Sequence, residues 1–493
     1  MKCFIISILL SASGFMAMAE IETYNYPGEA MSSTRFTVKV ENQPVYVLHS
    51  PIPASYAAFG TSGKARITIQ TTTDVKWVDV RPKSLNIKPV IQNNIISFSI
   101  PGPCLLSIEI NGSISNPLFI FANPIEQKPL KNDPDIIYFE AGKVHKAGTI
   151  YPKSHQTIYI EGGAVVEGAI SAKNVEHVKV AGYGILDGTN NNQLTNAEMA
   201  AIFNVQGGYE APGKYQRFIE FIDSKQISIE GLILHNSTTW QVVPINCDGV
   251  KITNLKLVSD NPSDDGIDIV RSRDVAVSKC FVRVKDDCVA IKAHLDYPPD
   301  VNTENVRVSE CVFWNAAWGN GIEIGFELHS DVVRNITFIN IDIIHVESGA
   351  VISIHNSDRG TVSDVLYEDI RVEDAYQKLF DLGIFRSKYC TDGSNDPAEI
   401  SLLQYPGVWD GALLVADDMR EHHSQFRGHI KNIVFRNIQI VDGLFPFSVF
   451  AGYDALHLVE NISIENLTVH GKRITSISDA RFFQEHTRNI SLH

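Results

Sequence analysis

A nine-fold repeat constrains the fold of this chain more than any other feature of its sequence. Each unit places two short strands of alternating apolar residues around a break at the fifth position, as in ISIEGLIL (227–234) and VRVSECVF (306–313). All the breaks except Lys279 and Glu310 are Gly, Asn or Asp, the residues that tolerate a tight bend. In chain order the breaks are Gly182, Gly231, Asn254, Lys279, Glu310, Asn340, Asp369, Asn437 and Asn466.

The spacing of the units indicates a solenoid. From 227 to 365 the units start 23 to 31 residues apart, and one interval of 68 residues precedes the unit at 433. Repeats of this length made of short strands predict a right-handed parallel β-helix, which we expect to occupy 135–493. Equivalent residues would then stack about 4.8 Å apart, which lets Asn side chains at equivalent bends hydrogen-bond as a ladder.

Two irregular features accompany the repeat. The long interval predicts an insertion at about 376–428, which we interpret as a loop beside a cleft, because long excursions from a solenoid are usually functional or disordered. Cys280 and Cys311 hold the same phase on consecutive rungs, next to the bend. We expect two stacked interior thiols there, with a disulfide as the alternative.

Residues 20–128 have a different pattern. Alternating runs such as TRFTVKV (34–40), ARITIQ (65–70) and IISFSI (95–100) are separated by Pro, Gly and Asn. Several short strands at this spacing predict a small β-sandwich. We interpret 124–134 as a linker, so the predicted fold class is all-β, with an N-terminal sandwich followed by the β-helix.

The first 19 residues predict export. Lys2 precedes an apolar core at 4–10, and Ala17-Met18-Ala19 forms a small-x-small site, so we expect a signal peptide cleaved after Ala19. No later apolar run reaches the roughly 20 residues that a membrane span needs. We therefore expect a periplasmic or secreted protein without a membrane span.

Charge and cysteine content exclude several partners. The net charge of −15 argues against nucleic acid, because phosphate binding needs clustered Lys and Arg. Loss of Cys3 with the leader leaves six of seven cysteines, too few for a disulfide scaffold, and their spacings match no zinc pattern. The sequence also has no phosphate-binding glycine loop and no HExxH, so we predict neither a metal nor a cofactor.

A third short strand follows the strand pairs and carries the chemistry. These strands are DDGIDIV (264–270), DDCVAIK (286–292), GNGIEIG (319–325) and GAVISIH (349–355). In a common phase their outward positions are Asp268, Ala290, Glu323 and Ser353, followed further along by Lys292, Gly325 and His355. The corners before the strands hold Asp264-Asp265, Asp286-Asp287 and Asn320.

The two doubled acidic corners predict a catalytic cluster. Asp265 and Asp287 lie 22 residues apart, about one coil, so their carboxylates would crowd into one patch. A single acidic corner is more simply a solvated turn, but like charges at rung spacing repel and raise one pKa. An acid that stays protonated beside ionised neighbours is what glycosidic bond hydrolysis needs.

The order DGIDI (265–269), DDCVAIK (286–292) and GNGIEIG (319–325), with Trp240 upstream, resembles the polygalacturonases of glycoside hydrolase family 28. The resemblance implies a pectin-lyase-like β-helix and an inverting hydrolase of a pectic or related α-linked polysaccharide. It implies Asp286 as the general acid, and Asp265 and Asp287 as the pair that activates water. Inversion implies carboxyl groups about 6.5–9.5 Å apart.

Two segments depart from that family's pattern. Its Gly-His-Gly corner is Gly-Asn-Gly here (319–321), and its Arg-Ile-Lys is Ser-Ile-His (353–355). The Arg that grips a galacturonate carboxylate is therefore absent, although Lys292 remains. The N-terminal sandwich and GIEIGFE (321–327) are similar to the family 49 dextranases, so a dextranase-like hydrolase of a neutral α-glycan is the alternative.

The other candidates surround these corners. Trp318 and Phe326 either stack on a sugar face or pack between rungs, and Lys292 either binds substrate or balances the aspartates. We predict that substrate binding uses Asn320, Glu323, His355, Lys292, Trp318, Phe326 and Asp268. Two further classes stay open: a polysaccharide lyase, which would need Ca²⁺ and a basic proton abstractor, and a non-catalytic glycan-binding β-helix.

Overall fold

The computed structural model describes residues 19–28, 30, 32–50, 52–191, 217–293, 297–394, 396–399 and 411–493. The predicted leader, apart from Ala19, lies outside these residues. Within the described residues, no helix is both long enough and apolar enough to cross a membrane.

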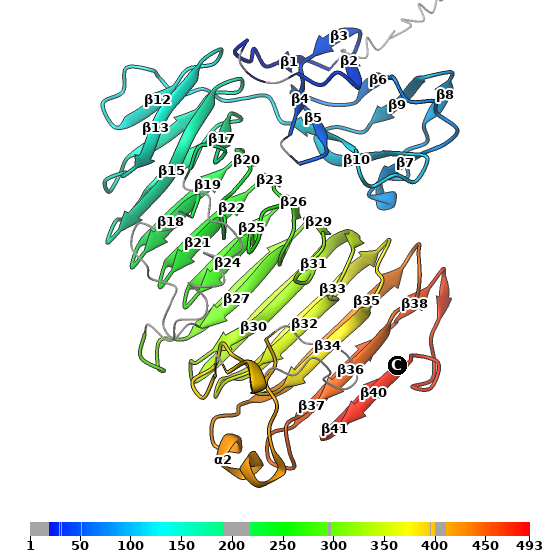
Figure 1. Cartoon of the computed structure of the whole chain (residues 1–493). Coiled ribbons are helices and arrows are strands. Elements are labelled where there is room, and N and C mark those ends of the chain that lie inside the picture. The colour runs from blue at the N-terminus through cyan, green and yellow to red at the C-terminus, as the bar shows by residue number, and fades with distance from the viewer. Residues whose placement is uncertain are drawn as a thin grey trace, which may run out of the picture.

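A 30-stranded sheet winds the chain from Ile136 to Leu492 into a parallel β-helix (Figure 1). Its strands pair in parallel with strands one coil away, except for the antiparallel pair β38 (Thr468–Val469) and β39 (Lys472–Arg473). Parallel crossovers are right-handed in nearly all proteins. The predicted all-β class, a right-handed parallel β-helix after a small β-sandwich, is confirmed.

The β-helix has three faces, and the first holds the strands before each bend. Alternate side chains of this face point inward and form a column that includes Val250, Val275, Val306 and Ile336, all nearly inaccessible to solvent. The strands of the first face are β12 (Ile136–Phe139), β14 (Thr157–Ile160), β16 (Lys179–Ala181), β19 (Lys225–Glu230), β22 (Asp248–Thr253), β25 (Arg273–Ser278), β28 (Thr303–Ser309), β31 (Val332–Val346), β33 (Thr361–Val372), β35 (His429–Ile440), β37 (Val459–Glu465) and β41 (Thr487–Leu492).

The second face follows the bend, and the third face follows the next corner. The second face comprises β13 (Val144–Ile150), β15 (Val165–Lys173), β17 (Ile185–Asp187), β20 (Ile233–His235), β23 (Lys256–Val258), β26 (Phe281–Val284), β29 (Val312–Asn315), β38 and the ends of β31, β33 and β35. The third face comprises the end of β15 and β18 (Ile219–Ile222), β21 (Val242–Ile245), β24 (Ile267–Val270), β27 (Val289–Ala293), β30 (Ile322–Leu328), β32 (Ala350–Asn356), β34 (Lys378–Ile384), β36 (Phe447–Ala451) and β40 (Phe482–Glu485).

Every predicted bend residue adopts a left-handed backbone conformation. Lys279 and Glu310, which are neither Gly, Asn nor Asp, have φ values of 57° and 56° like their neighbours in the stack. The predicted ladder forms where side chains allow it, since Asn466 Nδ2 donates to Asn437 Oδ1 at 2.9 Å and Asn437 Nδ2 to Asp369 Oδ1 at 2.8 Å. The rung geometry, rather than the local sequence, therefore dictates the bend.

The structure adds a second ladder that the sequence analysis did not predict. Asn335 donates to Asn305, and Asn305 to Asp274, at 3.2 and 2.9 Å, along the corner that leads into the first face. The stacked thiols were predicted correctly: Cys280 and Cys311 are free, and the Cys280 amide donates to Cys311 Sγ at 3.4 Å.

The sandwich packs on the second face. One sheet contains β1 (Ile21–Thr23), β4 (Val47–His49), β5 (Ser55–Thr61), β7 (Val78–Arg81), β10 (Cys104–Ile110) and β11 (Leu118–Asn123); the other contains β2 (Phe36–Val40), β3 (Gln43–Val45), β6 (Ala65–Thr71), β8 (Val90–Gln92) and β9 (Ile95–Ile100). The ring of Phe119 lies 4.9 Å from Phe281 and 5.9 Å from Trp314. Buried Arg81 reaches Glu373 of the β-helix at 2.7 Å. Aromatic packing and a buried ion pair thus join the two parts.

A cavity of about 1060 Å³ lies along this junction. It is lined from both sides, for example by Glu126 and Lys128 of the connecting segment and by Tyr183 and Asn254 of the β-helix. The residues of the acidic corners do not line it, so this cavity is separate from the predicted catalytic cluster.

The insertion begins later than predicted. Residues 378–384 form β34, which pairs with β32 and β36 and so belongs to the third face; the excursion runs from 385 to 428. It contains η2 (Pro397–Glu399), η3 (Asp417–Met419) and α2 (Arg420–Ser424), and residues 400–410 lie outside the described part. A third 3-10 segment, η1 (Lys83–Leu85), lies in the sandwich.

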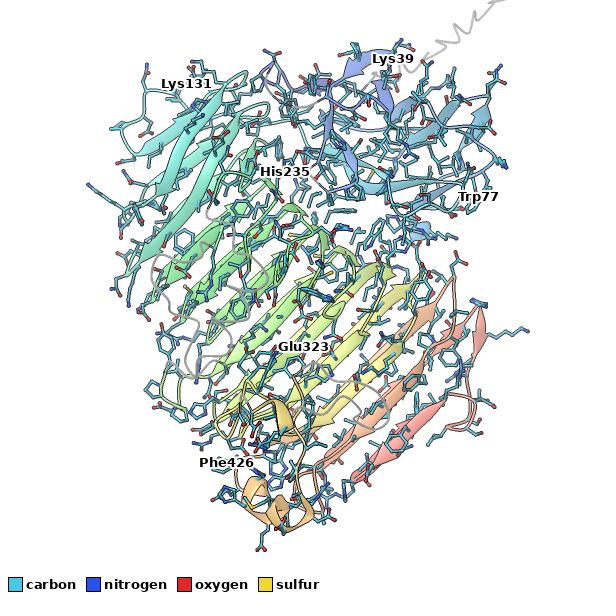
Figure 2. The ribbon with its side chains drawn as sticks, viewed as in Figure 1. Lys39, Trp77, Lys131, His235, Glu323 and Phe426 are labelled. Carbon is cyan, nitrogen blue, oxygen red and sulfur yellow. The ribbon has the colours of Figure 1, made fainter. Side chains whose placement is uncertain are left out.

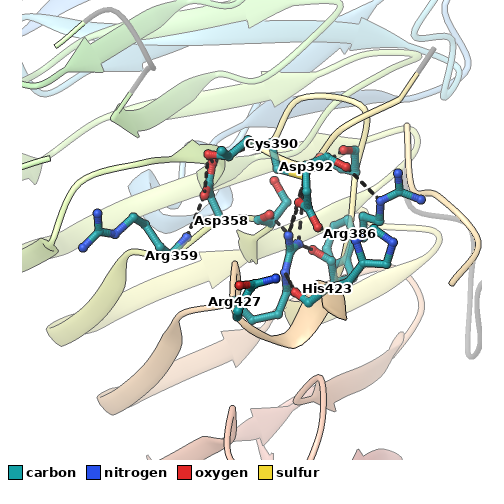
Figure 3. A network of polar contacts seen from close by, with 12 residues as sticks. Asp358, Arg359, Arg386, Cys390, Asp392, His423 and Arg427 are labelled. Atoms are coloured by element: carbon teal, nitrogen blue, oxygen red, sulfur yellow. Dashed lines mark hydrogen bonds and ion pairs between the residues drawn. The ribbon is translucent and has the colours of Figure 1, made fainter. Parts of the chain in front are cut away.

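Buried polar contacts fix the excursion to the β-helix (Figure 3). Arg427 pairs with Asp392 and donates to the carbonyls of Ser357 and Phe385 at 2.6 Å each. His423 Nδ1 lies 2.7 Å from Asp392 Oδ2. The excursion is therefore an ordered wall next to the third face over its described residues.

We expect Lys279→Asn to raise the free energy of unfolding by about 0.5–1 kcal/mol, because Asn accepts positive φ with less strain than Lys. Chemical denaturation measures the change. Lys251→Asn, an exposed β22 position of ordinary strand geometry, is the matched control and should be neutral or destabilising. A loss of stability in Lys279→Asn would contradict the argument.

Candidate active site

The stacking of β24 on β27 brings the two acidic corners together. In this register Ile267 lies beside Val289, and Asp268 beside Ala290, as the common phase predicted. One oxygen from each of Asp265, Asp286 and Asp287 lies within 4.8 Å of the others. The structure therefore gathers the three predicted catalytic aspartates into one cluster, while their nearest oxygens are closer than the separation of about 6.5–9.5 Å expected between carboxyl groups for inversion.

Asp264 does not join this cluster. Its buried carboxylate accepts hydrogen bonds from the backbone amides of Asn261, Lys285 and Asp286 at 3.0, 2.8 and 3.2 Å. Asp264 thus ties one corner to the next and holds the backbone on which Asp286 sits.

The three clustered aspartates differ in exposure and in electrostatics. Asp265 and Asp287 are buried, whereas Asp286 is partly exposed. Burial, and then the charges of Asp265 and Asp287, raise the pKa of Asp286 well above its usual value. Burial, and then the charge of Glu323, raise the pKa of Asp287 to about 7. Asp286 is therefore the carboxyl group that is both accessible and held protonated.

Asn320 connects the cluster to the next rung. Its backbone amide donates to Asp287 Oδ1 at 2.7 Å, and its side-chain Nδ2 lies 3.2 Å from the same oxygen and 2.9 Å from Glu323 Oε2. Its Oδ1 accepts from the Ala350 amide at 2.8 Å. Asn320 therefore orients Asp287 and is itself held from three sides.

Lys292 is surrounded by acceptors. Its Nζ lies 3.3 Å from the Gly325 carbonyl, 3.5 Å from Glu327, 3.7 Å from Asp265 and 4.0 Å from Asp268. Burial lowers the pKa of Lys292, but the carboxylates outweigh burial and raise it well above the usual value. The positive charge of Lys292 therefore offsets part of the negative charge of the surrounding carboxylates.

Glu323 and His355 form the neighbouring part of the site (Figure 2 labels Glu323). Buried Glu323 accepts from the Ser353 hydroxyl, and its Oε2 lies 2.9 Å from His355 Nδ1. The other ring nitrogen, Nε2, lies 3.1 Å from Asp381 Oδ2. The sequence analysis missed Asp381 because it placed this residue in the insertion, although KLFDLGI (378–384) has the strand alternation that could have revealed it.

The two aromatic candidates flank Asn320 and Glu323 in the sequence: Trp318 precedes them and Phe326 follows them. Trp318 is 45% exposed, and Lys285 Nζ lies 4.4 Å from its ring centroid. Phe326 stacks on His355 with centroids 4.9 Å apart, and Tyr389 of the excursion lies 5.5 Å from it. Trp240 is buried beneath Lys292, with Nζ 4.9 Å from its ring. Trp318 is the ring most available to a sugar.

The three clustered oxygens are close enough to contact one divalent cation. Ca²⁺ takes six to eight oxygen ligands, so three carboxylates would leave most of its coordination to water. We assign no metal to the cluster, because raised carboxyl pKa values and one accessible acid also suit proton transfer.

Asp268 is a buried carboxylate whose oxygens lack hydrogen-bond partners among the described residues. Burial raises its pKa to about 8. A raised folded-state pKa means that its contribution to stability is present below about pH 4 and lost as pH rises toward 8. Asp268 therefore costs stability at neutral and higher pH.

We expect Asp268→Asn to stabilise the protein by about 1–3 kcal/mol at pH 8 and to change it little at pH 4. Thermal and chemical denaturation at both pH values measure the effect. Asp274→Asn, an exposed acid of the same β-helix, is the matched control. Equal destabilisation of Asp268→Asn at both pH values would mean that Asp268 is ionised and stably paired with Lys292.

Sequence comparison relates just over half of the chain to one family. Residues 143–394 match the family model described as Glycosyl hydrolases family 28. A polygalacturonase of Juniperus ashei is 26% identical over 222 residues, which cover 43% of this chain and 39% of that protein. An endo-polygalacturonase of Pectobacterium parmentieri is 26% identical over 235 residues, covering 46% and 55%. The match thus spans well under two thirds of these relatives.

Two solved structures share the fold. The exopolygalacturonase of Thermotoga maritima superimposes with a TM-score of 0.50 at 17% identity, covering 69% of this chain and 84% of its own. Dex49A of Penicillium minioluteum superimposes with a TM-score of 0.58 at 13% identity, covering 95% and 94%. At these identities the likeness concerns the fold alone, and Dex49A covers nearly the whole chain.

Proposed function

Because the chain belongs to glycosyl hydrolases family 28, we propose that it hydrolyses glycosidic bonds in a polysaccharide, as a polygalacturonase-like enzyme on a pectic or related α-linked glycan. The convergence of Asp265, Asp286 and Asp287 within 4.8 Å carries the proposal. Family membership gives the reaction class, and the clustered carboxyl groups supply the acid and base that the reaction requires.

The three aspartates take separate roles in this proposal. Asp286 is the general acid, because it is the accessible member and its pKa is raised well above the usual value. Asp265 and Asp287 activate the water. Burial raises the pKa of both, and Lys292 beside Asp265 and the Asn320 amide on Asp287 act in the opposite direction by favouring the ionised forms. Protonating the leaving oxygen and deprotonating water on the opposite side of the sugar breaks the bond in one step.

The substrate has a second candidate, a neutral α-glycan of the dextranase type. Lys292 and His355 both face carboxylates within 4.0 Å, which leaves them poorly suited to bind a galacturonate carboxylate. Lys285 supports the pectic candidate instead. It is a partly exposed cation beside Trp318, next to Asp286 in the sequence, and a pectic substrate carries carboxylates that such a cation attracts.

The proposal includes export and a two-domain organisation. Export rests on the leader-like first 19 residues, with cleavage after Ala19. The domain boundary falls in 124–134, between the end of β11 at Asn123 and the start of β12 at Ile136. The sandwich and β-helix each have a hydrophobic core of their own, which supports their description as domains.

We expect the wild type to release reducing ends from at least one polymer in a panel of pectic, α-glucan and galactan substrates. Asp286→Asn should lower the rate by 10²-fold or more, since general acid catalysis contributes about 10²–10⁴-fold. Asp274→Asn keeps the same chemical change away from the cluster and should retain activity. Full activity of Asp286→Asn would exclude it as the acid.

The same assay separates the other classes. Products that absorb in the ultraviolet because they carry a new double bond, formed only with Ca²⁺, would identify a lyase. Glycan binding that persists in Asp286→Asn, without reducing ends from the wild type, would identify a binding module.

We expect the product to appear first in the anomeric configuration opposite to that of the bond cleaved. Inversion rests on the family resemblance and requires room for a water between the carboxyl groups. Proton NMR of the first minutes of the reaction measures the outcome. Retention of configuration would agree instead with the short spacing of the nearest carboxylate oxygens.

A further inference from the structure

A buried polar chain runs from the catalytic cluster across three further rungs. It passes from Asp287 to Asn320, Glu323, His355 and Asp381, and ends at Lys378, which pairs with Asp381. All six side chains are less than 9% exposed. Burying so many charges is costly unless each is paired, so the chain is held in one arrangement.

His355 is the cation in the middle of this chain. Both ring nitrogens face carboxylates, Glu323 at 2.9 Å and Asp381 at 3.1 Å, and Phe326 stacks on the ring. Burial lowers its pKa, but these two carboxylates outweigh burial and raise it to about 9. His355 is thus an imidazolium at neutral pH, and both of its ring nitrogens face carboxylates.

Glu323 connects His355 to Asn320, because its carboxylate contacts both side chains. Its carboxylate receives the Asn320 side-chain amide at 2.9 Å and the His355 backbone amide at 3.3 Å. The same Asn320 amide group lies 3.2 Å from Asp287 Oδ1. Two carboxylates, Glu323 and Asp287, therefore share one neutral amide, and they repel each other unless a cation neutralises one of them.

On the basis of the function proposed above, we propose that His355 is a positioning residue for the catalytic base Asp287: its positive charge neutralises Glu323, which fixes Asn320 and keeps Asp287 oriented and ionised. The charged groups around His355 are Glu323 of β30 and Asp381 and Lys378 of β34, with Asp287 and Lys292 of the preceding rung beyond them. Lys378 pairs with the same Asp381 Oδ2 that His355 Nε2 faces, so Asp381 keeps a cation without His355, and Glu323 is the carboxylate that depends more on His355.

The molecule contains a matched control for this arrangement. His345 is also buried between two carboxylates, Glu109 at 2.9 Å and Asp374 at 3.0 Å, but it lies where the sandwich meets the β-helix. Removing its charge should cost similar stability without reaching Asp287.

The test is the pH dependence of kcat on the best substrate of the panel. His355→Gln leaves Glu323 uncompensated, which raises the pKa of Asp287, so the acidic limb should move upward by roughly one pH unit. At the wild-type acidic midpoint this shift should lower kcat about five-fold, with KM changed less than about three-fold. His345→Gln should leave the limb in place.

Charge removal at Glu323 gives the opposite sign. Glu323→Gln removes the repulsion on Asp287, so the acidic limb should move to lower pH, and the double variant Glu323→Gln with His355→Gln should return toward the wild-type limb. This pair of variants keeps the inference testable if His355→Gln does not fold.

An unchanged acidic limb in His355→Gln together with a raised KM would overturn the inference and make His355 a substrate contact. If the wild type hydrolyses nothing, the proposed function fails first. The inference is then decided by ¹³C NMR titration of the Asp287 carboxyl, assigned with Asp287→Asn. That titration should still move upward in His355→Gln, and an unmoved titration would reject the inference.

Discussion

The in-register stacking of rungs is the constraint on which this structure depends. Each strand of the third face hydrogen-bonds to the one before it, so equivalent residues are held about 4.8 Å apart whatever their side chains prefer. Isolated acids would separate in water, but the corners before β24 and β27 cannot. The backbone hydrogen bonds of the β-helix therefore supply the free energy that keeps the acidic cluster together.

The cost of that crowding explains most of the polar chemistry around the site. Lys292 lies beside the cluster, and His355 and Lys378 lie on later rungs of the third face, each in contact with carboxylates. The Asp264 carboxylate accepts hydrogen bonds from the backbone amides of Lys285 and Asp286, so it is not one of the clustered carboxylates. The positive charges that offset the carboxylates therefore lie on several rungs.

The periodicity of the sequence was sufficient to predict the structural features that recur on every rung. It predicted the bends, including those at Lys279 and Glu310, the phase of the third strand and the stacked cysteines, because each follows from the register of one rung on the next. The alternation of 378–384 marks a strand that carries Asp381, but periodicity alone does not show that Asp381 contacts His355, because that contact depends on the side-chain packing between two rungs. The contact of Arg81 with Glu373 was equally inaccessible, because it joins residues 292 positions apart through the packing of two separate cores.

The excursion at 385–428 leaves the end of one rung and returns at the start of the next, while β33 pairs with β35 and β34 with β36 as if nothing intervened. The strand pairing of the solenoid therefore does not depend on the length of the loop between two rungs. Lengthening such a loop costs only a slowly growing closure entropy, about 0.6 kcal/mol per doubling. Loops of very different length can therefore be accommodated beside the third face while the strands that carry the acidic corners keep their register.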